Sequence, residues 1–339
     1  MKSIKELYRI GTGPSSSHTM GPRKAAEMFV TRHPDAAKFK VTLYGSLAAT
    51  GKGHMTDVAI IDTLEPTAPV EIIWQPKVFL PFHPNGMTFA AFDTDDKLIE
   101  NWTVYSIGGG ALAENSDTPS IESRDVYGMN SMTEILEWCE RSGKGYWEYV
   151  KECEDSDIWD YLNEVWKTMI DSIRRGLEEE GVLPGPLNLR RKASTYYIRA
   201  TGYKQSLQSR GLVFAYALAV SEENASGGKI VTAPTCGSCG VMPAVLYHLY
   251  KSRDFSDIRI LRALATAGLV GNIVKFNASI SGAEVGCQGE VGVACAMASA
   301  AANQLFGGSP AQIEYAAEMG LEHHLGICLL YTSPSPRDA

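Results

Sequence analysis

One glycine-rich stretch sets the expectations for this chain: Asn277-Ala-Ser-Ile-Ser-Gly-Ala-Glu-Val-Gly-Cys-Gln-Gly-Glu-Val-Gly-Val-Ala-Cys295. Its only charged residues are Glu284 and Glu290. Glycine inside a helix costs about 1 kcal/mol relative to alanine, but it permits a positive φ and a close approach of the backbone to another group. The stretch is therefore either a loop wrapped around a cofactor, with Cys287 as a thiolate ligand, or a tightly packed small-residue helix with Cys287 as an ordinary buried thiol.

Length and composition restrict the class of protein. The chain has 339 residues, enough for two domains that each bury a core. Its hydrophobic fraction of 45% and charged fraction of 21% are typical of a soluble globular protein. The net charge of −8, without a long basic run, argues against nucleic-acid binding. No apolar run approaches the ~20 residues that cross a bilayer, and the start of the chain lacks the apolar segment of a signal peptide. We expect a cytoplasmic protein that binds neither nucleic acid nor membrane.

The cysteines are odd in number and lie mostly late in the chain. In a reducing compartment they are not expected to form a disulfide framework. Five of the seven follow residue 230, which indicates metal binding, redox chemistry or buried packing in the C-terminal half. They are Cys139, Cys153, Cys236, Cys239, Cys287, Cys295 and Cys328.

Hydrophobic patterning predicts two domains, an α+β N-terminal domain and a mainly α-helical C-terminal domain. Residues 1–135 form the first domain, 136–155 a linker and 156–327 the second domain. In the first domain Pro22 opens a helix, and turn residues at Asp93-Thr-Asp-Asp96 predict a hairpin. Its strands are predicted at Lys40–Tyr44, Glu71–Trp74, Met87–Phe92 and Trp102–Ile107.

The second domain begins with a strongly amphipathic helix. Apolar residues from Ile158 to Leu177 fall on one face at a spacing of 3.6, with Asp155 or Ser156 as the expected cap. Further segments lack an alternating strand pattern, except Lys229–Thr232. Helices are expected at Ser206–Val220, Val241–Tyr250, Ile258–Val270, Val293–Leu305 and Pro310–His324.

The segment Gly11–Pro22 carries a cluster of hydroxyls, formed by Ser15, Ser16, Ser17 and Thr19, around His18. It lacks the third glycine of a dinucleotide fingerprint and the Gly-Lys-Ser/Thr of a P-loop. Adjacent serine and histidine do not by themselves form a catalytic triad. Hydroxyls and backbone N–H groups at a helix start bind small anions well, so we expect a carboxylate or phosphate here. The alternative is a serine-rich surface turn.

Three shorter motifs allow both a functional and a structural interpretation. In Gly51-Lys-Gly-His54, His54 is an acid or base near neutral pH or an exposed loop histidine. Thr235-Cys-Gly-Ser-Cys239 is weak as a zinc motif, and it is either a redox pair between a strand and a helix or two buried small thiols. In Glu322-His-His324 the two histidines point to different faces of a helix, so at most one serves a given site.

Six motifs stand in a fixed order along the chain: Gly11-Thr-Gly-Pro-Ser-Ser-Ser-His-Thr-Met-Gly-Pro22; Tyr44-Gly-Ser-Leu-Ala48 with Thr50-Gly-Lys-Gly-His54; Tyr105-Ser-Ile-Gly-Gly-Gly110; Leu183-Pro-Gly-Pro186 with Arg191-Lys-Ala193; Thr232-Ala-Pro-Thr235; and Asn277–Cys295. Together they resemble the iron–sulfur-dependent L-serine dehydratases in their single-chain form, a β-type domain followed by an α-type domain. The resemblance extends to about residue 327.

The resemblance implies an enzyme of amino-acid catabolism and gluconeogenesis that converts L-serine to pyruvate and ammonia. It implies a 4Fe–4S cluster with three thiolate ligands and one open iron acting as a Lewis acid. Cys287 would be the first ligand. His18, His54 and Asn277 would be catalytic, with the base left open between the two histidines. Ser15, Ser16, Ser17 and Thr19 would bind the substrate carboxylate, and we expect a homodimer.

The chain departs from the family pattern near its end. The family has Thr-Cys-Asp-Pro-Val and a later Pro-Cys there. Here Cys328 is one position early and lacks the following Asp-Pro, and no third cysteine follows. Cys236 also stands where the family often has asparagine. We expect residues 328–339 to be a non-native tail, and this polypeptide to hold no intact cluster and to be inactive, with Cys328 a doubtful ligand and the third missing.

Three other functions remain open from the sequence. An L-cysteine desulfidase on the same scaffold would differ in its preference between serine and cysteine. A non-catalytic amino-acid-binding protein would bind serine without turnover. A structural zinc protein would contain zinc and no acid-labile sulfide.

Overall fold

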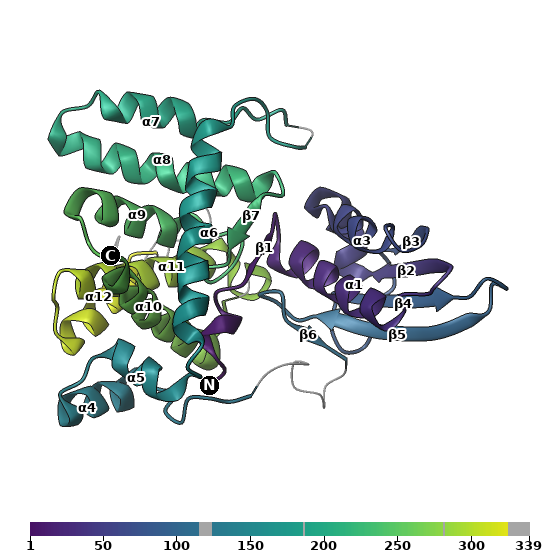
Figure 1. Cartoon of the computed structure of the whole chain (residues 1–339), viewed down its shortest axis with the longest axis horizontal. Coiled ribbons are helices and arrows are strands. Elements are labelled where there is room, and N and C mark those ends of the chain that lie inside the picture. The colour runs from purple at the N-terminus through teal and green to yellow at the C-terminus, as the bar shows by residue number, and fades with distance from the viewer. Residues whose placement is uncertain (115–123, 186, 281, 325–339) are drawn as a thin grey trace, which may run out of the picture. The chain divides into compact units, whose positions relative to one another are not determined.

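The computed structural model describes residues 1–114, 124–185, 187–280 and 282–324, without the side chains of residues 282–284 and 287. The chain divides into two compact units (Figure 1). The smaller unit is Thr12–Ser123, and the larger unit combines Met1–Gly11 with the chain from Arg124 onward. Among the described residues no helix is both long and apolar enough to cross a membrane.

A five-stranded sheet forms the smaller unit, in the order β3-β2-β4-β5-β6. β2 pairs in parallel with β3, and the remaining pairs are antiparallel. All four predicted strands are confirmed, as is the hairpin between β4 and β5. The bounds are β2 (Lys38–Tyr44), β3 (Val70–Gln75), β4 (Gly86–Phe92), β5 (Leu98–Ser106) and β6 (Leu112–Ala113).

The core of the smaller unit follows from the alternation of side chains along its strands. In β2 the residues Phe39, Val41 and Leu43 are buried and their neighbours are partly exposed. Helix α1 (Gly21–Arg32), which has Pro22 in its first turn as predicted, packs Phe29 against Phe39 and against the aromatic rings of β4 and β5. Helix α3 (Thr56–Leu64) lies beside α1 (Figure 1).

Two segments that the sequence predicts as loops form short helices instead. Ser16–Met20 is a π-helical turn, η2, because the Ser15 hydroxyl accepts a hydrogen bond from the backbone N–H of His18 and caps it. Gly51–His54 is a 3₁₀ turn, η3, which directly follows α2 (Gly45–Thr50). Gly45 has a φ of +48°, and a Cβ there would lie 2.6 Å from the carbonyl oxygen of Pro84, so only glycine fits at the start of α2.

The larger unit is mainly helical, and this confirms a sheet region followed by a helical region. The amphipathic helix predicted from Ile158 is α6, which buries its apolar face. The predicted helices of this half are all present. The bounds are α4 (Met132–Ser142), α5 (Tyr146–Cys153), α6 (Ile158–Glu178), α7 (Ala193–Thr201), α8 (Gln205–Ala225), α9 (Val241–Arg253), α10 (Asp257–Asn277), α11 (Gly282–Leu305) and α12 (Pro310–Glu322), with β7 (Lys229–Val231) paired to β1 (Ile10–Thr12).

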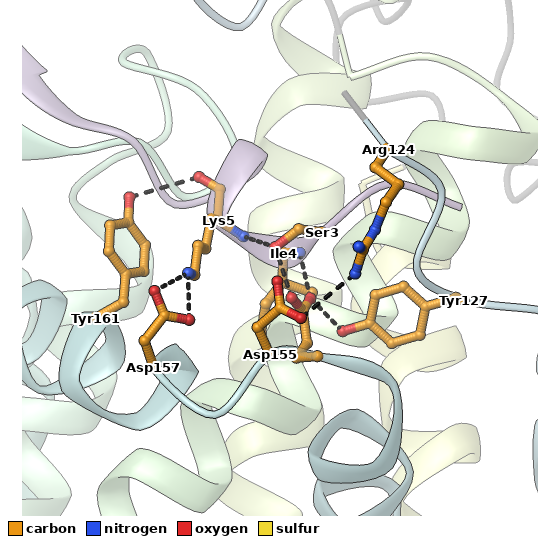
Figure 2. A network of polar contacts seen from close by, with 9 residues as sticks. Ser3, Ile4, Lys5, Arg124, Tyr127, Asp155, Asp157 and Tyr161 are labelled. Atoms are coloured by element: carbon orange, nitrogen blue, oxygen red, sulfur yellow. Dashed lines mark hydrogen bonds and ion pairs between the residues drawn. The ribbon is translucent and has the colours of Figure 1, made fainter. Parts of the chain in front are cut away.

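The predicted cap of α6 is wrong. The N-cap residue is Asp157, and its side chain makes no capping hydrogen bond. The two aspartates of this turn pair with cations instead: Asp157 binds Lys5 at 2.7 Å, and Asp155, one of the predicted caps, pairs with Arg124 at 3.3 Å (Figure 2). Ser309 caps α12 as predicted, in a reciprocal capping box with Gln312.

Helices α4 and α5 occupy residues 132–153, where the sequence predicts a linker over 136–155. Tyr146 and Val150 of α5 are fully buried in the core of the larger unit. The two compact units, divided near residues 12 and 124, are not the predicted family domains 1–135 and 156–327. The domain limits at residues 135 and 156 stay a prediction.

The first residues of the chain belong to the larger unit because a buried carboxylate binds them. Glu154 accepts hydrogen bonds from the Ser3 hydroxyl (2.7 Å), from the backbone N–H of Ile4 (2.8 Å) and from the Tyr127 hydroxyl (2.7 Å). Figure 2 shows this network around the turn that precedes α6. Ser3 also caps the short helix η1 (Ile4–Glu6), as predicted.

The glycine-rich stretch is helical. Its backbone forms α11, which is interrupted at Gly286, where φ is +67° and ψ 178°. The loop interpretation is thus wrong for most of the stretch, since small residues allow α11 to pack closely against its neighbours. Gly286 is the one glycine of α11 whose conformation L-residues rarely adopt.

Candidate active site

His18 lies at the centre of a polar cluster in the smaller unit. Its Nδ1 atom lies 2.9 Å from the Ser17 hydroxyl, and its Nε2 atom lies 3.1 Å from the hydroxyl of Ser46 on α2. Its backbone carbonyl accepts a hydrogen bond from Thr56 at 2.6 Å. The side chain is 9% exposed. Short helices on both sides, η2 and α2, thereby fix the ring.

Burial sets the charge of this imidazole. Loss of solvent lowers the pKa of His18 to about 4, and the neighbouring ring of His54 lowers it further, while the hydrogen bond with Ser46 opposes the shift. His18 is therefore neutral at pH 7. A neutral imidazole between two hydroxyls donates to one and accepts from the other.

His54 differs from His18 in its exposure and its bonding. The two ring centroids are 4.7 Å apart. Nδ1 of His54 lies 3.0 Å from the carbonyl oxygen of Thr50, and since a carbonyl only accepts, Nδ1 carries the proton. Among the described residues no group forms a hydrogen bond with Nε2. The backbone carbonyl of His54 accepts a hydrogen bond from Thr19 at 2.6 Å, which connects η3 to η2.

The four hydroxyls expected to bind a carboxylate are not equally available. Ser15 caps η2, Ser17 contacts His18, and the Thr19 hydroxyl, 2% exposed, donates to His54. Within the described residues the Ser16 hydroxyl makes no hydrogen bond. The structure thus brings His18, His54 and these hydroxyls together, and their binding role stays a prediction.

Sequence reasoning missed two further members of this cluster, Ser46 and Thr56. Ser46 lies inside the Tyr44–Ala48 motif, and Thr56 follows the Gly51–His54 motif. The Tyr44–Ala48 motif was a signal for Ser46, since its tight Gly-Ser element places a hydroxyl at the first turn of α2.

Asn277 ends α10 in the larger unit. Its amide nitrogen donates to the carbonyl oxygens of Ile273 (3.0 Å) and Asn130 (2.7 Å), which is the bonding of a structural cap. Its predicted catalytic role remains a prediction. Cys287 lies on the backbone of α11, but its side chain is outside the described residues, as is the whole of Cys328.

The described residues do not by themselves form an iron–sulfur site. Nowhere in the described parts of the chain do three His, Cys, Asp or Glu side chains converge as metal ligands. Burial raises the pKa of the Cys239 thiol to about 12, and it raises the pKa of Cys236 well above its usual value and the pKa of Cys295 as well. Without a bound metal these thiols are protonated at neutral pH. Cys295 instead lies 3.5 Å from Nε2 of His324.

The CxxC motif lies between β7 and α9, as a redox pair requires, but both thiols are 1% exposed. The segment Thr235–Cys239, which contains this motif, contacts Glu290 of α11, because the Thr235 hydroxyl donates a hydrogen bond to Oε1 of Glu290. Gly237 lies against the same carboxylate. Sequence reasoning noted Glu290 as one of two charges in the stretch but gave it no partner.

Two family models match the chain. The model "Serine dehydratase alpha chain" matches residues 59–328, and "Serine dehydratase beta chain" matches residues 3–75. The chain belongs to the serine dehydratase family. The two matches overlap between α3 and the end of β3, so this serine dehydratase family member carries the features of both chains in one polypeptide.

Curated relatives of the serine dehydratase family agree with this assignment. The chain is 38% identical to L-serine dehydratase TdcG of Escherichia coli (strain K12), over 96% of this chain and 84% of the relative. It is 39% identical to L-serine dehydratase 1 of the same organism and 38% identical to an L-serine dehydratase of Haemophilus influenzae, with the same coverage.

Proposed function

We propose that this chain is an L-serine dehydratase. In this reaction L-serine loses a proton from Cα and the hydroxyl group from Cβ, which together make water. The product, 2-aminoacrylate, tautomerises to an imine, which takes up water to give pyruvate and ammonia. The observation that carries the proposal is an identity of 38% over 96% of the chain to proteins that bear this name.

His54 is the base that takes the Cα proton. Its Nδ1–H donates to the Thr50 carbonyl, so the lone pair of the neutral ring is on Nε2, the nitrogen without a partner among the described residues. The ring is partly exposed and can reach a bound ligand. A general base must carry an accessible lone pair in the correct tautomer, and His54 meets both conditions.

His18 holds the neighbouring position as a neutral group. Both of its ring nitrogens contact hydroxyls, and its low pKa makes it a weak proton acceptor. A neutral ring beside His54 does not repel the proton that His54 takes up. An uncharged His18 thus does not oppose proton uptake by His54, and its two hydrogen bonds fix the geometry of η2 and α2.

The hydroxyls of η2 bind the substrate carboxylate. Ser16 has the open hydroxyl, while Ser15, Ser17 and Thr19 hold the turn in shape. Binding by a rigid polar turn costs little ordering entropy. These steps use only side chains of the described residues. Cys287 stays the predicted first ligand of a 4Fe–4S cluster, with Cys328 a doubtful ligand and the third ligand missing.

The test measures pyruvate release from L-serine after anaerobic reconstitution with iron and sulfide. Two proteins are compared: the chain as given, and a chimera in which residues 328–339 are replaced by the corresponding C-terminal segment of the Escherichia coli L-serine dehydratase 1. We expect the chimera to release pyruvate from L-serine and no sulfide from L-cysteine, and the chain as given to hold no stable cluster.

Two results would contradict these expectations separately. A chimera that carries a stable cluster but does not convert L-serine would refute the proposed reaction. A stable cluster and pyruvate release in the chain as given would refute the prediction that its last residues are non-native and that it is inactive.

A further inference from the structure

Three charged side chains of the larger unit meet where η1 packs against α10. Glu6 ends η1, Arg9 follows it, and Lys275 lies in the last turn of α10. Oε2 of Glu6 lies 3.7 Å from a guanidinium nitrogen of Arg9 and 3.9 Å from the ammonium nitrogen of Lys275. One carboxylate oxygen therefore faces two cations. All three residues belong to the unit that combines Met1–Gly11 with the chain from Arg124 onward, so their arrangement does not depend on the smaller unit.

The ammonium group of Lys275 makes no hydrogen bond within the described parts of the chain. Its distance of 3.9 Å from Glu6 is that of an ion pair and is too long for a hydrogen bond. An ammonium carries three donors, and the side chain of Lys275 is only 28% exposed, so water reaches these donors only in part. Because a partly buried charge with few partners is costly, a ligand that accepts hydrogen bonds from Lys275 offsets this cost.

The charges in this cluster do not balance. Glu6 carries one negative charge, while Arg9 and Lys275 carry two positive charges. Burial lowers the pKa of Lys275 to about 8, and the positive charges of Arg9 and Lys2 lower it further, while Glu6 opposes the shift. The side chains of Glu6 and Arg9 are 19% and 16% exposed, so solvent screens the excess charge incompletely. The cluster thus attracts an anion.

We propose that Arg9 and Lys275 bind a small oxyanion, a carboxylate or a phosphate. A guanidinium presents planar pairs of N–H donors that match two oxygens of such an anion, and an ammonium adds a compact charge. Glu6 acts as an internal competitor, because its own carboxylate faces both cations and repels a second anion. The site is separate from the hydroxyl cluster of the smaller unit, and the proposal does not depend on the proposed function.

The test measures the binding of radiolabelled acetate and of radiolabelled inorganic phosphate to the full-length chain, by equilibrium dialysis at pH 7 and constant ionic strength. In Lys275→Gln we expect the affinity to fall about 10-fold, the loss of one charge-assisted hydrogen bond. Glu6→Gln should instead raise the affinity about 3-fold, because it removes one partly screened competing charge. The matched control is Lys151→Gln, which removes an exposed lysine from α5 and should leave the affinity unchanged.

The opposite signs expected for Lys275→Gln and Glu6→Gln keep the test independent of folding, since a loss of structure, which circular dichroism would reveal, lowers the affinity in both. Nitrogen NMR of the Lys275 side chain gives a second measurement, because a bound oxyanion should raise the pKa of this ammonium. Binding of acetate alone or of phosphate alone would support the proposal and identify the ligand as a carboxylate or a phosphate. Binding of neither anion, equal affinities in all variants, a loss in both folded variants, or equal competition by chloride would overturn the proposal.

Discussion

In the smaller unit His18 is enclosed by hydroxyls, and both of its ring nitrogens have partners. In the larger unit Glu290 has one hydroxyl partner and an open oxygen within the described residues. The first arrangement holds a polar group rigid and neutral, which suits proton transfer at the neighbouring His54. The second leaves one carboxylate oxygen without a donor among the described residues. The following substitutions test this contrast.

The largest effect is expected at the base. In the protein that releases pyruvate, His54→Ala should lower kcat about 10³-fold, because positioned general bases contribute 10²–10⁴-fold to rates. KM for L-serine should change little, since the hydroxyls proposed to bind the carboxylate remain. The measurement is steady-state pyruvate release over a range of L-serine concentrations.

The matched control for His54 is His248→Gln in the larger unit, where the ring contacts Ser209 at 2.6 Å. It should leave kcat within about two-fold, as expected for a surface substitution. If His54→Ala retained most of its activity and His18→Ala did not, the assignment of the base would have to be reversed.

The next effect concerns how the larger unit holds the start of the chain. Glu154→Ala should lower the free energy of unfolding by about 3 kcal/mol, because it leaves the N–H of Ile4 and the hydroxyl of Tyr127 buried without an acceptor. Urea unfolding followed by circular dichroism measures this free energy.

Asp155→Ala is the control for Glu154→Ala. The Asp155 carboxylate is 73% exposed and pairs with Arg124 at the surface, so its loss should lower the free energy of unfolding by less than about 0.5 kcal/mol. Equal effects of the two variants would show that the buried network does not stabilise the unit.

Sequence patterns predicted the fold where side-chain periodicity reports burial. The strand of Phe39, Val41 and Leu43 and the long helix from Ile158 were correct, because one face of each is apolar. Glycine- and serine-rich segments gave the errors. The η2 segment was interpreted as a loop, and the glycine-rich stretch was left open between a loop and a helix. A hydrogen bond accepted by Ser15 and close helix packing, not periodicity, decide their conformations.

The site was predicted only in part, for a related reason. His18 and the hydroxyls are adjacent in sequence, so a single motif contained them, whereas His54 came from a second motif. The contact of Ser46 with His18 and the pairing of Thr235 with Glu290 join segments that are distant in sequence, and local patterns do not report such contacts. The charges and thiols singled out in the sequence thus stay candidates, because the sequence did not identify their partners.

The third prediction is an acid sensitivity specific to the smaller unit. Folding lowers the pKa of His18 from its usual 6.5 to about 4. Between these values the unfolded chain binds a proton that the folded chain does not, so stability falls as the pH falls below 6.5, and above 6.5 the group contributes nothing. At pH 5.5 the loss attributable to His18 should be about 1.4 kcal/mol.

The measurement compares urea unfolding at pH 7 and pH 5.5 for the wild type and for His18→Gln. The variant should lose less stability on acidification by this amount, because it lacks the His18 imidazole. Histidine-selective nitrogen NMR gives the pKa directly. A pKa of His18 near 6.5 in the folded chain would remove the basis for calling this imidazole neutral and rigid.

The smallest effect separates two glycines, one in each region. At Gly286 φ is +67° with ψ 178°, and among the described side chains a Cβ would meet nothing within 4 Å, so Gly286→Ala should cost about 1 kcal/mol from its backbone conformation. Gly53, beside His54, has no positive φ and equally open surroundings, so Gly53→Ala should change the free energy of unfolding by less than about 0.5 kcal/mol. The added methyl group clashes with no described side chain at either position. The difference between the two variants in the free energy of unfolding therefore measures the cost of placing alanine in the backbone conformation of residue 286. If both substitutions were neutral, α11 would be able to continue through residue 286 as a regular helix, and the break that precedes Glu290 would not be a property that the sequence enforces.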